Sequence, residues 1–251
     1  MSGALLSRAR AKLARSLPVK PRRLRPARGA LSITFDDFPR SAWSEGGAVL
    51  AGHGVRATYY ASGGLCGRRY LDLDQFTPED LEAVAACGHE VGSHGFEHAS
   101  VLDRSRRDFV ASVARNESFL RSILPQTRIE TFAYPFGSVS VGAKMAIAAR
   151  YRVGRGIAPG SNGPWIDASE IKSVAFEKRQ MAEHDIPSLI GEAASSGRWL
   201  SVFTHDVSDR PSPWGCRARD LDELIVNAKQ AGLEILPVVD VARGEPEAGR
   251  A

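Results

Sequence analysis

Short apolar runs recur along the chain, each about as long as a single β-strand. Two of the clearest are residues 31–35 (Leu-Ser-Ile-Thr-Phe) and residues 199–204 (Trp-Leu-Ser-Val-Phe-Thr), both rich in β-branched and aromatic side chains. Runs of this kind are typical of buried strands. Strands are therefore predicted at residues 31–35, 56–61, 89–93, 129–133, 151–154, 171–176, 199–204 and 233–239.

Helix-type segments fill the intervals between these strands. One of them starts with Thr77-Pro78-Glu79-Asp80, in which Thr suits the N-cap, Pro the first helical position and Asp the third. Gly88 marks the end of the same helix. The predicted helices cover residues 42–54, 78–87, 104–124, 141–150, 180–197 and 220–231.

Alternation of strands and helices predicts a parallel sheet with helices on its outside, an α/β fold. The seven or eight predicted strands favour a closed or nearly closed barrel, and an open doubly wound sheet is the alternative. The length of 251 residues suits a single domain of this kind. No G-x-G-x-x-G or P-loop sequence follows a predicted strand, which argues against nucleotide binding.

Basic residues gather at the N-terminus. Residues 1–30 hold nine of the 33 Lys and Arg and no acidic residue, whereas all 29 Asp and Glu lie beyond them. Pro18, Pro21 and Pro26 argue against a long helix there. We predict a flexible basic arm over residues 1–29, a barrel over residues 30–243 and a loose tail over residues 244–251.

If the arm is helical, apolar and basic side chains separate onto two sides, as in a helix that lies at a membrane surface. The apolar side would hold Leu6, Ala9, Leu13 and Leu17, and the basic side Arg8, Lys12 and Arg15. A solvated arm is the alternative. Binding of nucleic acid would depend on the arm alone, and the acidic remainder of the chain disfavours it.

Targeting features and cysteines indicate the compartment. Residues 1–7 form the longest uncharged stretch of the arm, too short for a secretory signal, and no stretch has the apolar length of a membrane span. Cys66, Cys87 and Cys216 fit no zinc cassette and are interpreted as free thiols in a reducing compartment. A cytoplasmic protein at the inner membrane face, with peripheral membrane contact through the arm, is therefore expected.

Polar, metal-capable side chains follow several predicted strands directly. In parallel α/β folds the carboxyl ends of the strands carry the catalytic residues. Asp36 and Asp37 follow the first strand, and adjacent side chains point in different directions, so one can bind a metal while the other faces a substrate. A solvated turn is the alternative for an isolated pair of acids.

Two histidines and a third, separate histidine extend this set. His94 and His98 follow the strand at residues 89–93, and their spacing lets both reach one metal if the segment is helical or tightly turned. Two imidazoles and one carboxylate leave coordination positions open, as catalytic zinc sites require. His205 follows the strand at residues 199–204 and has the pKa range of a general acid. A chance pair of surface histidines and a core His205 are the alternatives.

The motifs, taken in order, resemble the polysaccharide deacetylase family (carbohydrate esterase family four, the nodulation-type chitooligosaccharide deacetylase homology domain) over about residues 30–240. They are Thr34-Phe-Asp-Asp37, Ser93-His94 with His98, Tyr134-Pro-Phe-Gly137 and Phe203-Thr-His205. The resemblance implies a distorted (β/α) barrel with about seven parallel strands and one divalent metal ion, with zinc expected first and cobalt, nickel or manganese as alternatives.

Roles follow from the resemblance, position by position. It implies that Asp37, His94 and His98 bind the metal. It also implies that Asp36 is the general base and that His205 donates a proton to the leaving group. A backbone N–H near Tyr134 would hold the developing oxyanion.

Two departures from the family pattern concern substrate and base. The third family motif usually carries an Arg shortly before its Pro, and residues 131–137 contain none. We hypothesise that Arg155 supplies this cation near Asp36, with Asp167 as its partner; an Arg155 that binds substrate or faces solvent is the alternative. The fourth motif is not cleanly present, and Trp214 is predicted either to stack on a sugar ring or to anchor its loop.

The predicted substrate-binding residues are Tyr134, Pro135, Phe136 and Trp214. The predicted activity is metal-dependent removal of an acyl group, typically acetyl, from an amino sugar or another acylated glycan, which the expected location makes a lipid-linked one. A cyclic-amide or ureide hydrolase of the same fold is one alternative. A catalytically silent carbohydrate-binding or scaffold protein is another, although all five expected side chains are present.

Overall fold

The computed structural model describes residues 13–24 and 29–244. The strands are β1 (Pro21–Arg23), β2 (Ala30–Phe35), β3 (Thr58–Ala61), β4 (Arg69–Tyr70), β5 (Leu73–Asp74), β6 (Glu90–Ser93), β7 (Thr131–Ala133), β8 (Val153–Arg155), β9 (Trp165–Asp167), β10 (Val174–Ala175), β11 (Trp199–Thr204) and β12 (Glu234–Ile235). The helices are α2 (Arg40–Ser44), α3 (Gly46–His53), α4 (Pro78–Ala86), α5 (Arg106–Ile123), α6 (Val141–Arg150), α7 (Ile186–Ser195), α8 (Ala218–Gln230) and α9 (Val238–Arg243). Short 3₁₀ turns cover Gly63–Leu65, Pro135–Gly137 and Met181–Glu183.

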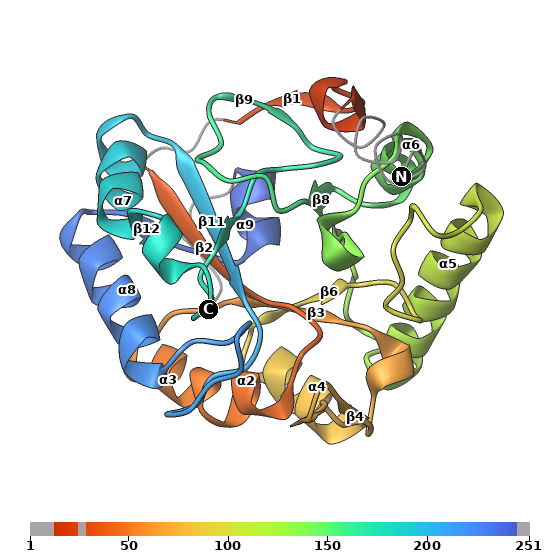
Figure 1. The fold of residues 1–251 in the computed structure, drawn as a ribbon, viewed down its shortest axis with the longest axis horizontal. Coiled ribbons are helices and arrows are strands. Elements are labelled where there is room, and N and C mark those ends of the chain that lie inside the picture. Colours follow the sequence, from red (N-terminus) through yellow and green to blue (C-terminus); the bar gives the residue numbers. More distant parts are fainter. Residues whose placement is uncertain (1–12, 25–28, 245–251) are drawn as a thin grey trace.

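The main sheet is curled, with helices around its outside (Figure 1). In the described part of the chain seven parallel strands follow the order β10-β11-β2-β3-β6-β7-β8, and β12 pairs with β2 beside this path. Residues 171–175 bring the two edges together, because Ile171 bridges to Arg155 while β10 pairs with β11. The predicted α/β barrel of about seven parallel strands is confirmed.

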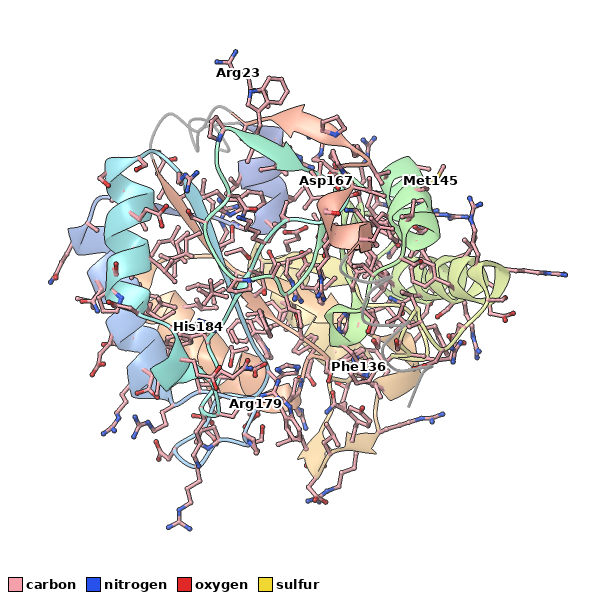
Figure 2. The ribbon with its side chains drawn as sticks, turned by 45° about the horizontal axis from the view of Figure 1, so that its top comes forward. Arg23, Phe136, Met145, Asp167, Arg179 and His184 are labelled. Atoms are coloured by element: carbon pink, nitrogen blue, oxygen red, sulfur yellow. The ribbon has the colours of Figure 1, made fainter. Side chains whose placement is uncertain are left out.

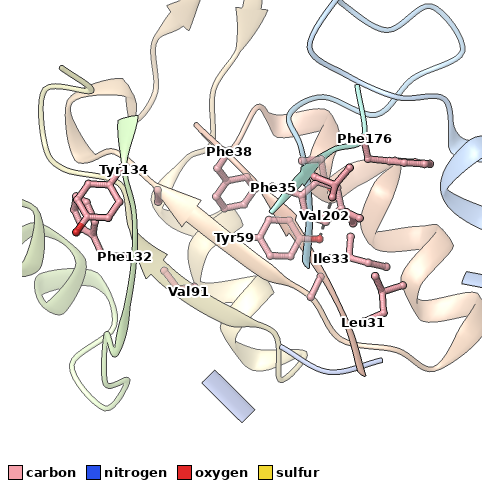
Figure 3. Close-up of a cluster of buried hydrophobic side chains, with 14 of the residues drawn as sticks. Leu31, Ile33, Phe35, Phe38, Tyr59, Val91, Phe132, Tyr134, Phe176 and Val202 are labelled. Carbon is pink, nitrogen blue, oxygen red and sulfur yellow. Dashed lines mark hydrogen bonds between the residues drawn. The ribbon is translucent and has the colours of Figure 1, made fainter. Parts of the chain in front are cut away.

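Strand β2 shows how the sequence pattern builds the barrel wall. All six of its residues are buried, as expected for a strand covered on both faces. Its apolar side chains face the helices, and the ring of Phe35 lies beside Gly46 of α3. Figure 3 shows the resulting cluster, in which Leu31, Ile33 and Phe35 lie near Tyr59 and Val202.

The alternate residues of β2 face the barrel interior. Ser32 donates to the carbonyl of Leu236, which follows β12, and receives a hydrogen bond from the indole of Trp199 in β11; both strands pair with β2. Because side chains alternate along a strand, Ser32, Thr34 and Asp36 share this inner face. The polar inner residues therefore lead directly to the first acid of the predicted site.

Most predicted elements are present, and the capping signals are used as predicted. Thr77 Oγ1 accepts from the amide of Asp80 at 3.3 Å, and the Asp80 carboxylate accepts from the amide of Thr77 at 2.9 Å. The strand at residues 199–204 and the helix at residues 141–150 have the predicted bounds.

Three predicted elements differ from the structure. The helix at residues 42–54 is divided at Glu45 into α2 and α3. The helix at residues 180–197 begins only at Ile186, where Asp185 caps the amide of Ser188. The strand at residues 233–239 is replaced by the short β12 and α9, because Pro237 cannot donate to a strand ladder and suits the residue before a helix.

The N-terminal segment differs from the predicted flexible arm. Residues 13–24 belong to the folded body: β1 pairs antiparallel with β9, and the buried Lys144 ammonium donates to the carbonyls of Ala14 and Leu17, both at 2.9 Å. Residues 1–12 and 25–28 of the predicted arm, and residues 245–251 of the predicted tail, lie outside the described residues. Among the described residues, no helix has the length and apolar character needed to cross a membrane.

Candidate metal centre and catalytic pocket

Asp36 lies at the end of β2 and forms an ion pair across the barrel interior. Both of its carboxylate oxygens accept from Nη2 of Arg155, which is fully buried at the end of β8. The guanidinium carbon lies 5.3 Å from the ring centre of Tyr60 and 5.0 Å from that of Phe203. The predicted contact between Arg155 and Asp36 is therefore present in the structure.

The predicted partnership of Arg155 with Asp167 is wrong. Asp167 lies 2.8 Å from the ammonium of Lys144 and also accepts from the amides of Val19 and Lys20. These contacts hold the N-terminal segment (residues 13–24) in place, and we call the cluster of Lys144, Asp167 and Glu170 the anchor. Asp167 lies in β9, which pairs with β1 in a separate two-stranded sheet.

The backbone turns sharply after Asp36, which sends the next acid toward the histidines. Asp37 has φ 60°, in the left-handed region that Asp tolerates better than most side chains. Phe38 follows at φ 63° and is fully buried, with its ring stacked 5.1 Å from that of Phe76. Packing of Phe38 therefore holds the turn that points Asp37 away from Arg155.

His94 and His98 meet Asp37 because Gly95 forms a tight turn at φ 72°. His94 Nδ1 lies 2.8 Å from the carbonyl of Ala133, which can only accept, so the proton is on Nδ1 and Nε2 keeps its lone pair. Nε2 of His94 is 3.5 Å, and Nε2 of His98 2.9 Å, from Oδ1 of Asp37. One ligand atom of each residue lies within 4.8 Å of the others.

This donor set fits a divalent metal ion. Oδ1 of Asp37 is buried and has no hydrogen-bond partner among the described residues. A carboxylate oxygen and two imidazole nitrogens are ligands that zinc accepts, and three protein ligands leave room for water and substrate. The hydrogen bond from His94 to Ala133 is the kind of support that orients a metal-binding imidazole.

Charges and burial set the protonation states in this cluster. Burial lowers the pKa of His94 to about 4, which keeps its imidazole neutral near pH 7. Burial alone would raise the pKa of Asp37, but the close contact with the His98 imidazole and the electrostatic attraction of His98, His205 and His94 outweigh it, so that the pKa lies well below its usual range. A neutral His94 imidazole and an ionised Asp37 carboxylate are the forms that bind metal.

His205 lies on the other side of Asp37, at the end of β11. Its Nε2 is 4.0 Å from Oδ2 of Asp37, and its Nδ1 is 3.4 Å from Oε1 of Glu177. Burial alone would lower the pKa of His205, but the interaction with Glu177 and the charges of Asp37 and Asp36 raise the pKa to about 9. His205 is therefore protonated near pH 7 and can donate a proton.

Sequence reasoning missed Glu177, which is fully buried and also accepts from Nε of Arg179 at 2.7 Å. Glu177 directly follows the predicted strand at residues 171–176, so the rule that strand ends carry functional residues would have found it. Its two contacts fix the carboxylate against His205.

The base of a pocket of about 560 Å³ is formed by the carboxylates and imidazoles described above: Asp36, Asp37, His94, His98, Glu177 and His205. Of the predicted substrate-binding residues, Phe136 and Trp214 line this pocket. Figure 2 shows Phe136, from the turn after β7, and Arg179 and His184, from the connection between β10 and α7; all three line the pocket.

Tyr134 and Pro135 are buried away from the pocket lining, contrary to the prediction of substrate contact. The Tyr134 hydroxyl donates to the carbonyl of Ser169 at 2.8 Å, and its amide donates to the carbonyl of Arg155 at 3.0 Å. Since Pro135 has no N–H, the amide of Phe136 is the next donor along the chain for an oxyanion.

Sequence comparison places these observations in a family. A model of the polysaccharide deacetylase family matches residues 8–153, more than half of the chain. A chitin deacetylase from Pestalotiopsis sp is 31% identical over 104 residues, 41% of this chain and 33% of that protein. A chitooligosaccharide deacetylase from Sinorhizobium fredii (strain NBRC 101917 / NGR234) is 30% identical over 116 residues, 45% of this chain and 50% of that protein. The alignments thus span a third to a half of these curated relatives.

Solved structures share the fold at low identity. The Xyl-CE4 domain of a multidomain xylanase from the hindgut metagenome of Trinervitermes trinervoides has a TM-score of 0.56 at 15% identity, over 86% of this chain and 90% of that chain. A CE4 family pseudoenzyme from Bacillus anthracis has a TM-score of 0.57 at 14% identity, over 91% and 70% of the two chains. Peptidoglycan deacetylase PdaC from Bacillus subtilis has a TM-score of 0.55 at 16% identity, over 88% and 93%.

Proposed function

We propose that this chain, which belongs to the polysaccharide deacetylase family, is a metal-dependent hydrolase that removes an acyl group from a carbohydrate. The observation that carries the proposal is the convergence of three metal-capable side chains at the base of one pocket. Asp36, the base in this proposal, lies on one side of them, and His205, the acid, lies on the other. The relatives named as chitin and chitooligosaccharide deacetylases make an N-acetylated amino sugar the first substrate to test.

Each residue of the pocket has a defined part in this hydrolysis. A divalent cation held by Asp37, His94 and His98 would supply Lewis-acid chemistry, polarising the acyl carbonyl and lowering the pKa of water. Asp36 accepts a proton from the attacking water, and its ion pair with Arg155 fixes the orientation of the carboxylate.

The remaining groups act on the carbonyl oxygen and the leaving group. The amide of Phe136 donates to the oxyanion that develops as water adds to the acyl carbon. Protonated His205 donates its proton to the leaving nitrogen or oxygen as the acyl bond breaks, while Glu177 stabilises the imidazolium.

The catalytically silent alternative is disfavoured by the same geometry. A binding protein has no need for a buried Arg155 against Asp36 or for a protonated His205 beside a metal-capable cluster. Such arrangements shift pKa values and are typical of catalytic sites.

The test is release of acid from a panel of N- and O-acylated sugars by the protein loaded with zinc or cobalt. We expect wild-type protein to release acetate and Asp36→Asn to lower kcat/KM by about 10²–10⁴. Metal content, measured on both proteins, should be equal, because Asp36 lies outside the Asp37–His94–His98 set. Stoichiometric metal without acid release from any sugar would contradict the proposal and favour the cyclic-amide alternative.

A further inference from the structure

Large apolar side chains are exposed at the mouth of the pocket. Nine large hydrophobic side chains are exposed among the described residues, and three of them line this one pocket: Leu71, Phe136 and Ile157. Their exposed fractions are 50%, 59% and 36%. They come from the hairpin of β4 and β5, from the turn after β7 and from the segment after β8, so three separate parts of the chain bring apolar surface to one opening.

Two of these residues, Leu71 and Phe136, have a strained backbone conformation. Leu71 and Asp72 form the two-residue loop of the hairpin, at φ 48° and 62°, where Gly and Asn are the preferred residues. Phe136 has φ 57°. Left-handed conformations of bulky residues are unfavourable, and they persist mainly where a site requires them.

The surrounding structure holds all three side chains in place. The hairpin is attached directly behind Asp37, because Pro39 bridges to Gln75 and the amide of Phe76 donates to the carbonyl of Phe38 at 3.1 Å. Ile157 covers Gly137 so closely that a Cβ there would lie 2.1 Å from Ile157 Cγ1, which places Ile157 next to Phe136. The apolar mouth is therefore a built feature of the barrel rim.

Burial separates the mouth from the site of chemistry. Asp37 and His94, at the base, are 4% and 1% exposed. The acyl carbonyl must reach that base, so the mouth contacts the part of the substrate remote from the bond that breaks. Sugar hydroxyls require hydrogen-bond partners, and the aliphatic side chains of Leu71 and Ile157 offer none.

We propose that Leu71, Phe136 and Ile157 form a subsite for an aliphatic chain carried on the sugar, so that the substrate is a lipid-linked acylated glycan. This inference rests on the proposed function and narrows its substrate class. Transfer of methylene groups from water onto this exposed apolar surface supplies the binding free energy. The chain is attached through the anomeric oxygen, as an aglycone, and is separate from the acyl group that is removed.

Three synthetic substrates distinguish the position of the chain. They are the methyl glycoside of N-acetylglucosamine, its octyl glycoside below the concentration of micelle formation, and the methyl glycoside with N-octanoyl in place of N-acetyl. We expect the octyl glycoside to exceed the methyl glycoside in kcat/KM by about tenfold or more, the effect of two buried methylene groups, mainly through KM. Equal values, or a preference for the N-octanoyl substrate, would overturn the inference.

Matched variants assign the preference to the mouth. Leu71→Asn keeps a residue that suits the left-handed turn, and Ile157→Thr keeps the β-branch, so both should fold. Each should reduce the octyl preference severalfold, whereas Met145→Thr should leave it unchanged, because Met145 is 52% exposed on α6 outside the pocket lining. Full preference in both mouth variants would overturn the assignment.

Calorimetric binding separates failure of this inference from failure of the proposed function. If neither the three substrates nor any sugar of the N- and O-acylated panel is hydrolysed, the proposed function fails. Tighter binding of the octyl than of the methyl glycoside, weakened by Leu71→Asn, would still support the subsite. Equal binding of the two glycosides would overturn it.

Discussion

The pocket and the anchor of the N-terminal segment both place aspartates beside basic side chains, but they satisfy the carboxylates differently. Asp167, in the anchor, accepts at both oxygens: Oδ1 from Lys20 and Ser169, and Oδ2 from Val19, with the Lys144 ammonium 2.8 Å away. In the pocket, Oδ1 of Asp37 lacks a hydrogen-bond partner among the described residues.

The difference separates a structural cluster from a binding cluster. Buried polar groups are almost always hydrogen-bonded, so a saturated carboxylate such as Asp167 needs no further ligand. Oδ1 of Asp37 departs from this rule, because it is buried, faces two imidazoles and has no hydrogen bond among the described residues. A cation bound there would satisfy it. Saturation of the oxygens therefore distinguishes Asp167 from Asp37, although both lie beside basic side chains.

The largest expected effect is on metal content. His98→Gln should abolish stoichiometric zinc binding, lowering affinity by more than the 10–100-fold that loss of a supporting hydrogen bond costs. His184→Gln is the matched control, because His184 lines the same pocket without belonging to the metal-capable set. Elemental analysis after dialysis measures the zinc content of both variants. Equal zinc retention by the two variants would contradict the assignment of the pocket cluster as the metal site.

Removal of the buried cations should affect stability next. Arg155→Met and Lys144→Met should each lower the free energy of unfolding by about 3–5 kcal/mol, because each leaves a carboxylate without its buried counter-charge. Urea denaturation measures both. Adding Asp36→Asn to Arg155→Met should recover part of the loss, since it removes the single unpaired charge.

The anchor should respond differently to the same test. Lys144 faces two acids, Asp167 at 2.8 Å and Glu170 at 3.2 Å. Adding Asp167→Asn to Lys144→Met therefore leaves Glu170 without its buried counter-charge and should recover less stability than the pocket pair does. Equal recovery of stability in the two clusters would contradict the distinction between the Asp36–Arg155 pair in the pocket and the network around Lys144 in the anchor.

The pH dependence of stability should come chiefly from the pocket. Folding raises the pKa of His205 from 6.5 to about 9, so its contribution is fully present below pH 6.5 and is lost as the pH rises through 9. The metal-free protein should lose about 3 kcal/mol over this range. Urea denaturation at a series of pH values measures the slope, and His205→Gln should flatten it; an unchanged slope in that variant would assign the effect elsewhere.

The sequence predicts the convergence of the pocket residues well, for a physical reason. Parallel strands present their carboxyl ends at one edge of the barrel, so Asp36, His94 and His205 had to approach one another once the strands were placed. The alternation of side chains along β2 also separates the directions of Asp36 and Asp37. Of the two contacts predicted for Arg155, the one with Asp36 is present and the one with Asp167 is not, because Asp167 lies in β9, outside the main sheet.

Other parts depend on contacts between distant residues. Glu177 is followed by Lys178 and Arg179, which makes the segment resemble a solvated charged turn, although the carboxylate is fully buried. The charges and prolines of the N-terminal segment favour a flexible arm locally. Hydrogen bonds from Val19 and Lys20 to Asp167, far along the chain, hold its described part against the barrel instead.

Arg15 connects the two regions and should show the smallest effect. Its Nη2 donates to the carbonyl of Gly137, at the pocket rim, at 2.9 Å, and its Nε lies 3.5 Å from Glu170 of the anchor. Because the Arg15 side chain is 39% exposed, Arg15→Ala should lower the free energy of unfolding by less than about 1 kcal/mol. We expect kcat/KM to change less than about threefold, since the Gly137 turn is also closed by the bond from its own amide to the carbonyl of Tyr134 at 2.8 Å. A loss of turnover similar to that of Asp36→Asn would show instead that the anchor controls the geometry of the pocket.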